Sequence, residues 1–336
     1  MTTGSNGISQ SSFDDSDEEL GVVVGIDGSA SSHGALLLAA AEATFRGLTL
    51  TLLSTYSLSP WSDTALKAGH GMASESFLRQ QSSDELHHAQ DKYLSDHKGR
   101  IHHVVRFGDP TTVLVELSAH ADLLVVGARG RGGFVGRLAG SVAIALPRYS
   151  ECPVMIVPEH VAADVAVDHQ PDFSSPVVVG VDGSERSLSA LLLGAESATL
   201  RKVPLALVRV LPPVQRLVPW GPGSEHHEAL VQQLNTELEG DRAWAVSHYP
   251  EVDIRVEGVS EGATVDQLTR HSEYAQVLYL GSKGRGGFAG WLLGSTADGM
   301  VQQARGPITV VPHWPDGRLA GRRDFPGGSN LHPAEE

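Results

Sequence analysis

The feature that most constrains this chain is a glycine pattern, G-x2-G-x9-G-S, which occurs twice, at residues 127–141 and 281–295. Each copy follows a short apolar run, residues 123–126 or 277–280, and opens into a segment that can be helical. This order predicts a strand, a glycine loop and a helix start. Glycines let backbone N–H groups approach an anion without interference from a Cβ atom, and the helix N-terminus adds partial positive charge. Each copy therefore predicts a bound nucleotide phosphate.

The repetition extends well beyond the loops. Residues 21–29 reappear as 176–184, both ending in Asp-Gly-Ser, and residues 48–53, Gly108 and 153–158 match 203–208, Gly262 and 307–312. The chain is therefore a tandem duplication, and its 336 residues suffice for two domains that each bury a core. The expected division is a disordered acidic tail at 1–19, a first domain at 20–158, a linker at 159–175, a second domain at 176–312 and a disordered tail at 313–336.

Strand and helix signals alternate along each half. In the first half the strands are expected at 21–27, 49–56, 101–107, 123–127 and 154–157, and the helices at 31–46, 74–98, 111–120 and 141–149. Ser31 or Ser32 is expected to cap the first helix. Strands separated by helices imply a mostly parallel sheet covered on both faces. We therefore expect two tandem α/β domains, each a doubly wound, five-stranded sheet. Asp27 and Gly127, at two strand ends, should face one crevice.

Charge separates the loops from the rest of the chain. The formal net charge of -15 argues against nucleic acid and membrane surfaces as partners, because such binding needs a basic face. The glycine loops contain no carboxylate, and positive charge is concentrated where a phosphate would lie. Whether these cations contact phosphate directly is left open; they are Arg129, Arg131 and Arg137 in the first loop and Lys283 and Arg285 in the second.

Other features exclude several classes of site. The single Cys152 allows no disulfide within the chain and is expected to be a buried structural thiol. The adjacent histidines at 87–88, 102–103 and 226–227 point in different directions on a helix or strand, so surface histidines and no metal site are expected. No leader pattern or membrane-length apolar run is present, which predicts a cytoplasmic protein.

The combination of these features resembles the universal stress protein family, as two complete domains in tandem of the ATP-binding kind. The resemblance covers residues 20–158 and 176–312. It depends on the first-strand aspartate before Gly-Ser, the fourth-strand glycine loop and the proline-flanked last strand, which occur together in both halves. It implies a Rossmann-like fold, ATP with Mg²⁺ as the ligand, and a homodimer. In similar proteins the last strands pair, so residues 154–157 should meet 308–311 within this chain.

The resemblance also implies where the ligand lies. The adenosine would lie between the ends of the first and second strands, and the phosphates would lie on the glycine loops. Asp27 and Asp182 could instead serve only a turn or a helix cap. The candidate ATP-binding residues are Gly25, Asp27, Thr55, Val126, Gly127, Arg129, Gly130, Gly140, Ser141 and Val142 in the first half, and Gly180, Asp182, Val210, Leu280, Gly281, Lys283, Gly284, Gly294, Ser295 and Thr296 in the second.

The function implied is a nucleotide-linked regulator of stress response, dormancy or growth, with an unidentified protein partner. Neither loop contains an acid or a histidine that could activate water, and no G-x4-GK[ST] motif is present, so no strong catalysis is expected. Two alternatives stay open. One is slow ATP hydrolysis. The other is a protein-interaction scaffold with a structural nucleotide, in which segments 57–83 and 212–227 would form the working surface.

Overall fold

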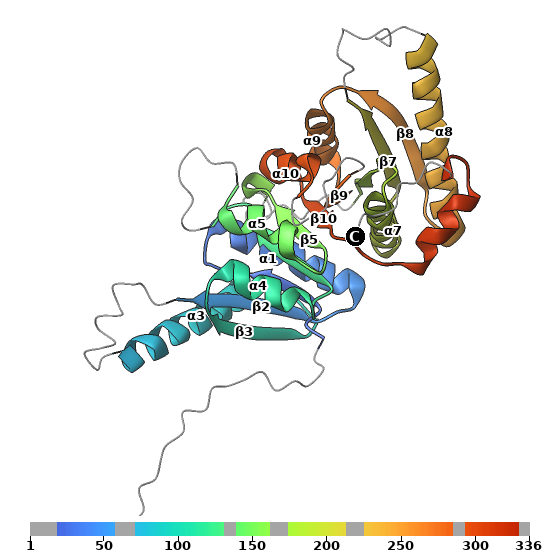
Figure 1. The fold of residues 1–336 in the computed structure, drawn as a ribbon. Helices are drawn as coiled ribbons and strands as arrows, with labels where there is room; N and C mark the ends of the chain where they lie inside the picture. The colour runs from blue at the N-terminus through green and yellow to red at the C-terminus, as the bar shows by residue number, and fades with distance from the viewer. Residues whose placement is uncertain are drawn as a thin grey trace, which may run out of the picture.

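The computed structural model describes residues 19–57, 71–130, 139–161, 174–212, 225–284 and 293–328. These residues form a single ten-stranded sheet with the strand order β3-β2-β1-β4-β5-β10-β9-β6-β7-β8. Each half contributes five neighbouring strands, and helices cover both faces (Figure 1). The expected α/β fold is confirmed, and the two expected sheets are continuous with each other.

The first half follows the predicted order closely. Its helix cap was predicted wrongly: Ser29, and not Ser31 or Ser32, caps the first helix, since its hydroxyl accepts a hydrogen bond from the Ser32 amide at 3.1 Å. The strands are β1 (Val22–Gly25), β2 (Leu50–Tyr56), β3 (Ile101–Phe107), β4 (Leu123–Gly127) and β5 (Val154–Val157), and the helices are α1 (Ala30–Arg46), α3 (Gly71–Tyr93), α4 (Pro110–Ser118) and α5 (Ser141–Tyr149).

The second half repeats this arrangement and adds a short helix. Its strands are β6 (Val177–Gly180), β7 (Leu205–Leu211), β8 (Ile254–Glu261), β9 (Val277–Gly281) and β10 (Ile308–Val311). Its helices are α7 (Glu185–Arg201), α8 (Glu225–His248), α9 (Thr264–Tyr274), α10 (Ser295–Gln303) and the 3-10 helix η1 (Gly317–Asp324). Pairing within each half is parallel throughout the described strands.

Two apolar clusters explain why the sheet is covered on both sides. Alternate side chains of β1 point in opposite directions, so Val22 and Val24 join one cluster and Val23 joins the other. Helices α1, α3, α7 and α8 pack on the first cluster, and α4, α5, α9 and α10 pack on the second. Continuous apolar strands such as Val22–Gly25 are typical of parallel sheets buried on both faces.

The last strands of the two halves join the sheets. β5 and β10 pair antiparallel, with Ile308 opposite Ile156, Thr309 opposite Met155 and Val310 opposite Val154. The expected pairing within one chain is thus confirmed. It covers two sheet edges that would otherwise expose unpaired backbone groups.

The C-terminal tail was predicted wrongly for residues 313–328. This segment is ordered, and its helix η1 packs beside α8 (Figure 1). Arg322 is only 1% exposed and donates to the Asp241 carboxylate at 2.6 Å. A polar, glycine-rich composition favours disorder, but composition does not reveal that one arginine has a buried partner. Residues 1–18 and 329–336 lie outside the described residues, as do residues 58–70 of the variable segment 57–83 and residues 213–224 of the variable segment 212–227.

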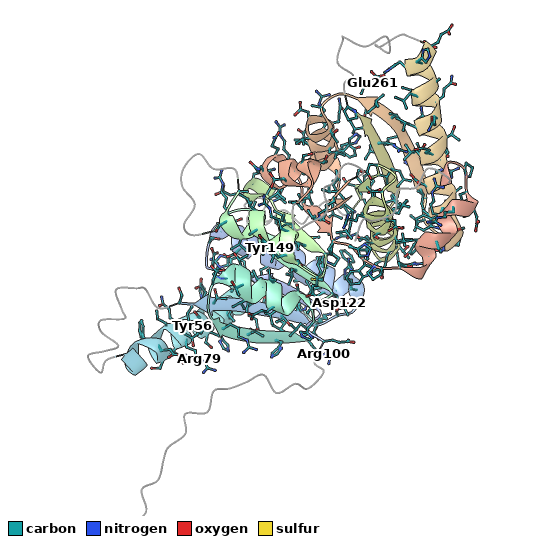
Figure 2. All side chains as sticks on the ribbon, viewed as in Figure 1. Tyr56, Arg79, Arg100, Asp122, Tyr149 and Glu261 are labelled. Atoms are coloured by element: carbon teal, nitrogen blue, oxygen red, sulfur yellow. The ribbon has the colours of Figure 1, made fainter. Side chains whose placement is uncertain are left out.

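Cys152 and His227 are both buried in the fold. Cys152 is 1% exposed, as predicted, and burial raises the pKa of its thiol to about 12. His227 was predicted to lie at the surface, and this prediction is wrong. Its side chain is 8% exposed and lies 2.8 Å from the carboxylate of Glu261, the residue at which β8 ends (Figure 2). Within the described part of the chain, no group of three or more His, Cys, Asp or Glu residues could hold a metal ion. In the same part, no helix is long and apolar enough to cross a membrane.

Candidate nucleotide-binding sites

Two cavities lie at equivalent places in the two halves, beyond the carboxyl ends of the strands. The first has a volume of about 450 Å³ and the second about 310 Å³. The walls of each come from the ends of three strands, a glycine loop and three helix N-termini. In the first half these are the ends of β1, β2 and β4, the loop after β4, and the N-termini of α1, α4 and α5. This is the point where successive helices change face, and ligands of doubly wound sheets bind there.

The structure brings together all the site residues predicted from the sequence. Ten of them line the first cavity: Gly25, Asp27, Thr55, Val126, Gly127, Arg129, Gly130, Gly140, Ser141 and Val142. Their counterparts line the second: Gly180, Asp182, Val210, Leu280, Gly281, Lys283, Gly284, Gly294, Ser295 and Thr296. Residues far apart in sequence therefore converge on one cavity in each half.

The two aspartates have a local structural role in addition to their place in the cavity. Asp27 Oδ1 accepts hydrogen bonds from the Ser29 amide at 3.0 Å and the Ser29 hydroxyl at 2.6 Å. Asp182 Oδ1 receives the same pair from Ser184, at 3.0 and 2.6 Å. Each serine in turn caps the following helix. The turn and cap role left open by the sequence is therefore present, with the rest of each carboxylate on the cavity wall.

The glycines of the loops have different tasks. A Cβ atom on Gly127 would lie 2.8 Å from the carbonyl carbon of Ser31, and one on Gly281 would lie 2.8 Å from that of Arg186. These two glycines therefore allow close contact between the loop and the first helix of the domain. Gly140 is less crowded, because its Cβ would lie no nearer than 3.5 Å to any atom.

Helix N-termini supply amide donors at the cavity walls. Gly140 and Gly294 are the N-cap residues of α5 and α10, and neither cap uses a side-chain hydrogen bond. The first N–H groups of a helix have no acceptor within that helix. Ser141 and Ser295 begin these helices, so amides and hydroxyls with the polarity needed for an anion face each cavity.

The described loop cations differ between the two cavities. Arg129 lies 2.5 Å from the Glu159 carboxylate, an exposed ion pair at the edge of the first cavity. In the second, burial and repulsion from Arg186 lower the pKa of Lys283. A negative ligand beside Lys283 would favour its charged form. Arg131, Arg137 and Arg285 lie outside the described residues.

Comparison with known proteins identifies one family in both halves. The sequence profile described as "Universal stress protein family" matches residues 21–158 and 174–312. The chain belongs to the universal stress protein family. A universal stress protein of Mycobacterium tuberculosis is 34% identical over 298 residues, covering 87% of this chain and 96% of that protein. One from Mycolicibacterium smegmatis is 31% identical over 301 residues, with 87% and 97% covered.

One solved structure of this family supports the fold over most of the chain. A universal stress protein from Archaeoglobus fulgidus has a TM-score of 0.58 at 16% identity, covering 88% of this chain and 100% of that one. A universal stress protein solved in complex with cAMP is 31% identical, covers 41% of this chain and 96% of its own length, and has a TM-score of 0.31.

Sequence reasoning missed part of each wall in the two universal stress domains. One available signal was the matching pair Gly108 and Gly262, which have φ values of 141° and 142° and precede the N-termini of α4 and α9. The missed wall residues are mostly apolar side chains beside the predicted ones. The missed residues are Ile26, Ser32, Leu53, Pro110, Leu114, Ala139 and Ala143 in the first domain, and Val181, Ser187, Val208, Thr264, Leu268 and Ala297 in the second.

Proposed function

We propose that each universal stress domain binds ATP with Mg²⁺, and that the chain is a nucleotide-linked regulator of stress response, dormancy or growth. The observation that carries this proposal is the convergence, in both halves, of a first-strand aspartate, a glycine loop and a helix N-terminus on one cavity. That arrangement offers apolar walls for a base and amide donors for phosphates.

Size and chemistry are consistent with a nucleotide. Small-molecule sites usually enclose about 300–1,000 Å³, and both cavities reach this range, at about 450 and 310 Å³. The phosphates would lie at the N-termini of α5 and α10. Mg²⁺ bound with a nucleotide takes its ligands mainly from phosphates and water, with few protein groups. The hydroxyls of Ser141 and Ser295 are the protein oxygens best placed to join them.

The same sites favour binding over hydrolysis. Among the described residues that line the cavities, the only carboxylates are Asp27 and Asp182, and each already accepts hydrogen bonds from a neighbouring serine. Efficient phosphoryl transfer needs a group that positions the attacking water and a charge clamp on the leaving phosphate. We therefore expect at most slow turnover of bound ATP.

Introduction of a negative charge at the two helix caps tests this proposal. Aspartate is a favourable N-cap residue, so the double substitution Gly140→Asp and Gly294→Asp should keep α5 and α10 folded while repelling phosphate. We expect calorimetric titration with ATP and MgCl₂ to show saturable binding by the unmodified chain. The Asp variant should bind at least about 100-fold more weakly, a loss equivalent to about 2.7 kcal/mol.

The matched control is Gly140→Asn with Gly294→Asn, which adds nearly the same volume without charge. It should lose much less affinity than the Asp variant, and thermal unfolding should show that both variants are folded. Equal ATP binding by the Asp variant and the unmodified chain would contradict a phosphate site at these caps. Absence of binding by the unmodified chain would leave the scaffold alternative. Titration with adenosine and cAMP shows whether the triphosphate is required.

A further inference from the structure

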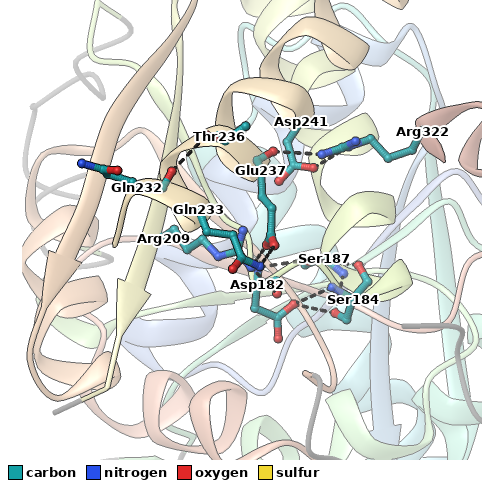
Figure 3. A network of polar contacts seen from close by, with 10 residues as sticks. All are labelled: Asp182, Ser184, Ser187, Arg209, Gln232, Gln233, Thr236, Glu237, Asp241 and Arg322. Atoms are coloured by element: carbon teal, nitrogen blue, oxygen red, sulfur yellow. Dashed lines mark hydrogen bonds and ion pairs between the residues drawn. The ribbon is translucent and has the colours of Figure 1, made fainter. Parts of the chain in front are cut away.

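The second cavity is flanked by a buried ion pair at a position where the first domain has a serine. Gly25 pairs with Leu53 and Gly180 pairs with Val208, so Ser54 and Arg209 occupy equivalent places one residue further along. Arg209 is 4% exposed, and its guanidinium lies 2.9 Å from the Glu237 carboxylate on α8 (Figure 3). An arginine therefore lies beside the second site, where the equivalent position beside the first site is Ser54.

Arg209 holds the aspartate of the second site. Its Nη2 donates to the main-chain carbonyl of Asp182 at 3.1 Å. The Asp182 amide donates to the Ser187 hydroxyl at 3.3 Å, and Asp182 Oδ1 accepts from Ser184. The amide and carboxylate contacts have equivalents at Asp27, whereas the arginine contact is specific to the second domain. Asp182 is thus anchored through its amide, its carbonyl and its carboxylate.

The ordered C-terminal segment, residues 313–328, docks on the same turn of α8. Asp241 lies one helical turn after Glu237 and accepts from Arg322 Nε at 2.6 Å. Arg322 Nη2 donates to the main-chain carbonyl of Glu237 at 2.9 Å. A Cβ atom on Gly240, between them, would lie 2.9 Å from the carbonyl carbon of Pro326, so the segment is in close contact with the helix. Arg322, Glu237, Arg209 and Asp182 therefore form a continuous chain of contacts (Figure 3).

Stability alone does not explain these ion pairs. Burying two charges costs desolvation free energy, and well-packed apolar residues often stabilise a fold as well or better. A charged pair does fix the directions of its hydrogen bonds. The neighbouring strand is also altered at this place: the pairing shifts by one residue between Leu207 and Arg209, near Gly258, which has a φ of 83°. Bulges of this kind redirect nearby side chains and are frequent beside functional sites.

We propose that Arg209 is a positioning residue of the second site and that the C-terminal segment sets the ATP affinity of this site through α8, while the first site is independent of it. The inference depends on the ATP binding proposed above. Displacement of the segment would release Arg322 from α8, loosen the Glu237–Arg209 pair and free the Asp182 carbonyl. The second domain would then be the regulated one.

Hydrogen–deuterium exchange at increasing ATP concentration, with MgCl₂ and the full chain, separates the two sites. Peptides 26–32 and 181–187 report on the first and second sites. We expect Arg209→Ser, which introduces the residue of the first domain, to raise the ATP concentration for half-maximal protection of 181–187 about tenfold. The value for 26–32 should stay within about twofold of the unmodified chain. Arg322→Gln should also raise the value for 181–187 alone.

The matched control is Arg201→Gln. Arg201 forms a buried pair with Glu42 at the C-terminal ends of α1 and α7, the sheet edge opposite to the cavities, and Glu42 retains Arg46 at 3.1 Å. This variant should unfold at a lower temperature and keep the ratio of the two half-maximal concentrations. A changed ratio in the control would overturn the inference, because general destabilisation would then suffice.

Other outcomes separate the inference from the proposed function. Equal shifts at both sites, or no shift at 181–187, in Arg209→Ser would overturn the positioning role while ATP binding stands. An unchanged second site in Arg322→Gln would overturn the role of the C-terminal segment. Absence of ATP-dependent protection in both peptides of the unmodified chain would overturn the proposed function and this inference together.

Discussion

At the scale of single residues, the two loop glycines Gly127 and Gly140 differ in how closely neighbouring atoms surround them. Because a Cβ on Gly127 would meet the backbone of Ser31 at 2.8 Å, we expect Gly127→Ala to lower the free energy of unfolding by about 1–3 kcal/mol through overpacking. Gly140→Ser is the control, since serine is a good N-cap and the nearest atom is 3.5 Å away. Urea unfolding of both variants checks this, and equal stability would show that the loop moves freely away from α1.

At the scale of elements, the contact of α3 with β3 should make stability depend on pH. His87 and His103 have ring centroids 4.6 Å apart, and burial, followed by repulsion from His87 and His102, lowers the pKa of His103 below its ordinary value of 6.5. Burial lowers the pKa of His97 as well. The unfolded chain then takes up protons first, so this stability is complete above pH 6.5 and is lost as the pH falls toward the folded-state values.

Thermal unfolding between about pH 7.5 and 5.5, which is about one pH unit on each side of the unperturbed histidine pKa, measures this effect. We expect the melting temperature to fall over this interval, and to fall less in His103→Gln. His120→Gln, at an exposed position, is the control and should behave like the unmodified chain. An identical decrease in all three proteins would show that the contact of α3 with β3 does not sense pH.

At the scale of the whole molecule, contacts on both faces reinforce the β5–β10 junction. Glu42 on α1 pairs with Arg201 on α7, and Arg148 on α5 pairs with Asp298 on α10 at 2.6 Å. Burial disfavours charge on Glu42, but Arg201 and Arg46 outweigh it and lower the pKa of this carboxyl. The Glu42 pair thus contributes stability above the unfolded-state pKa of a glutamate, and this contribution is lost as the pH falls through the folded-state value.

The same junction constrains any dimer of the whole chain. The family resemblance implies a homodimer, but β5 and β10 already pair with each other, so a second copy must bind elsewhere. We expect sedimentation velocity to show a dimer at micromolar concentration. A monomer throughout that range would refute this expectation.

The sequence by itself determined the order of the strands and of the helices between them, the duplication, and the twenty predicted residues among those that line the two cavities. These follow from local signals: apolar runs make strands, Asp-Gly-Ser turns into a helix, and the spacing from Gly127 to Ser141 or from Gly281 to Ser295 returns the chain to the same edge of the sheet. Right-handed crossovers then leave little freedom in how such units are arranged. The duplication also tests the predicted element order, because the two halves must have the same order of strands and helices.

Only the tertiary structure decided the contacts between residues that no repeat relates. Arg322 meets Asp241, and Arg209 meets both Glu237 and the Asp182 carbonyl, across long separations in sequence. No periodic pattern or motif in the sequence predicts these contacts, because each depends on where α8 and the C-terminal segment lie in space. The polar C-terminal composition indicated disorder for the same reason: what orders that segment is a partner supplied by a distant helix, and a partner of this kind becomes visible only when the chain is folded.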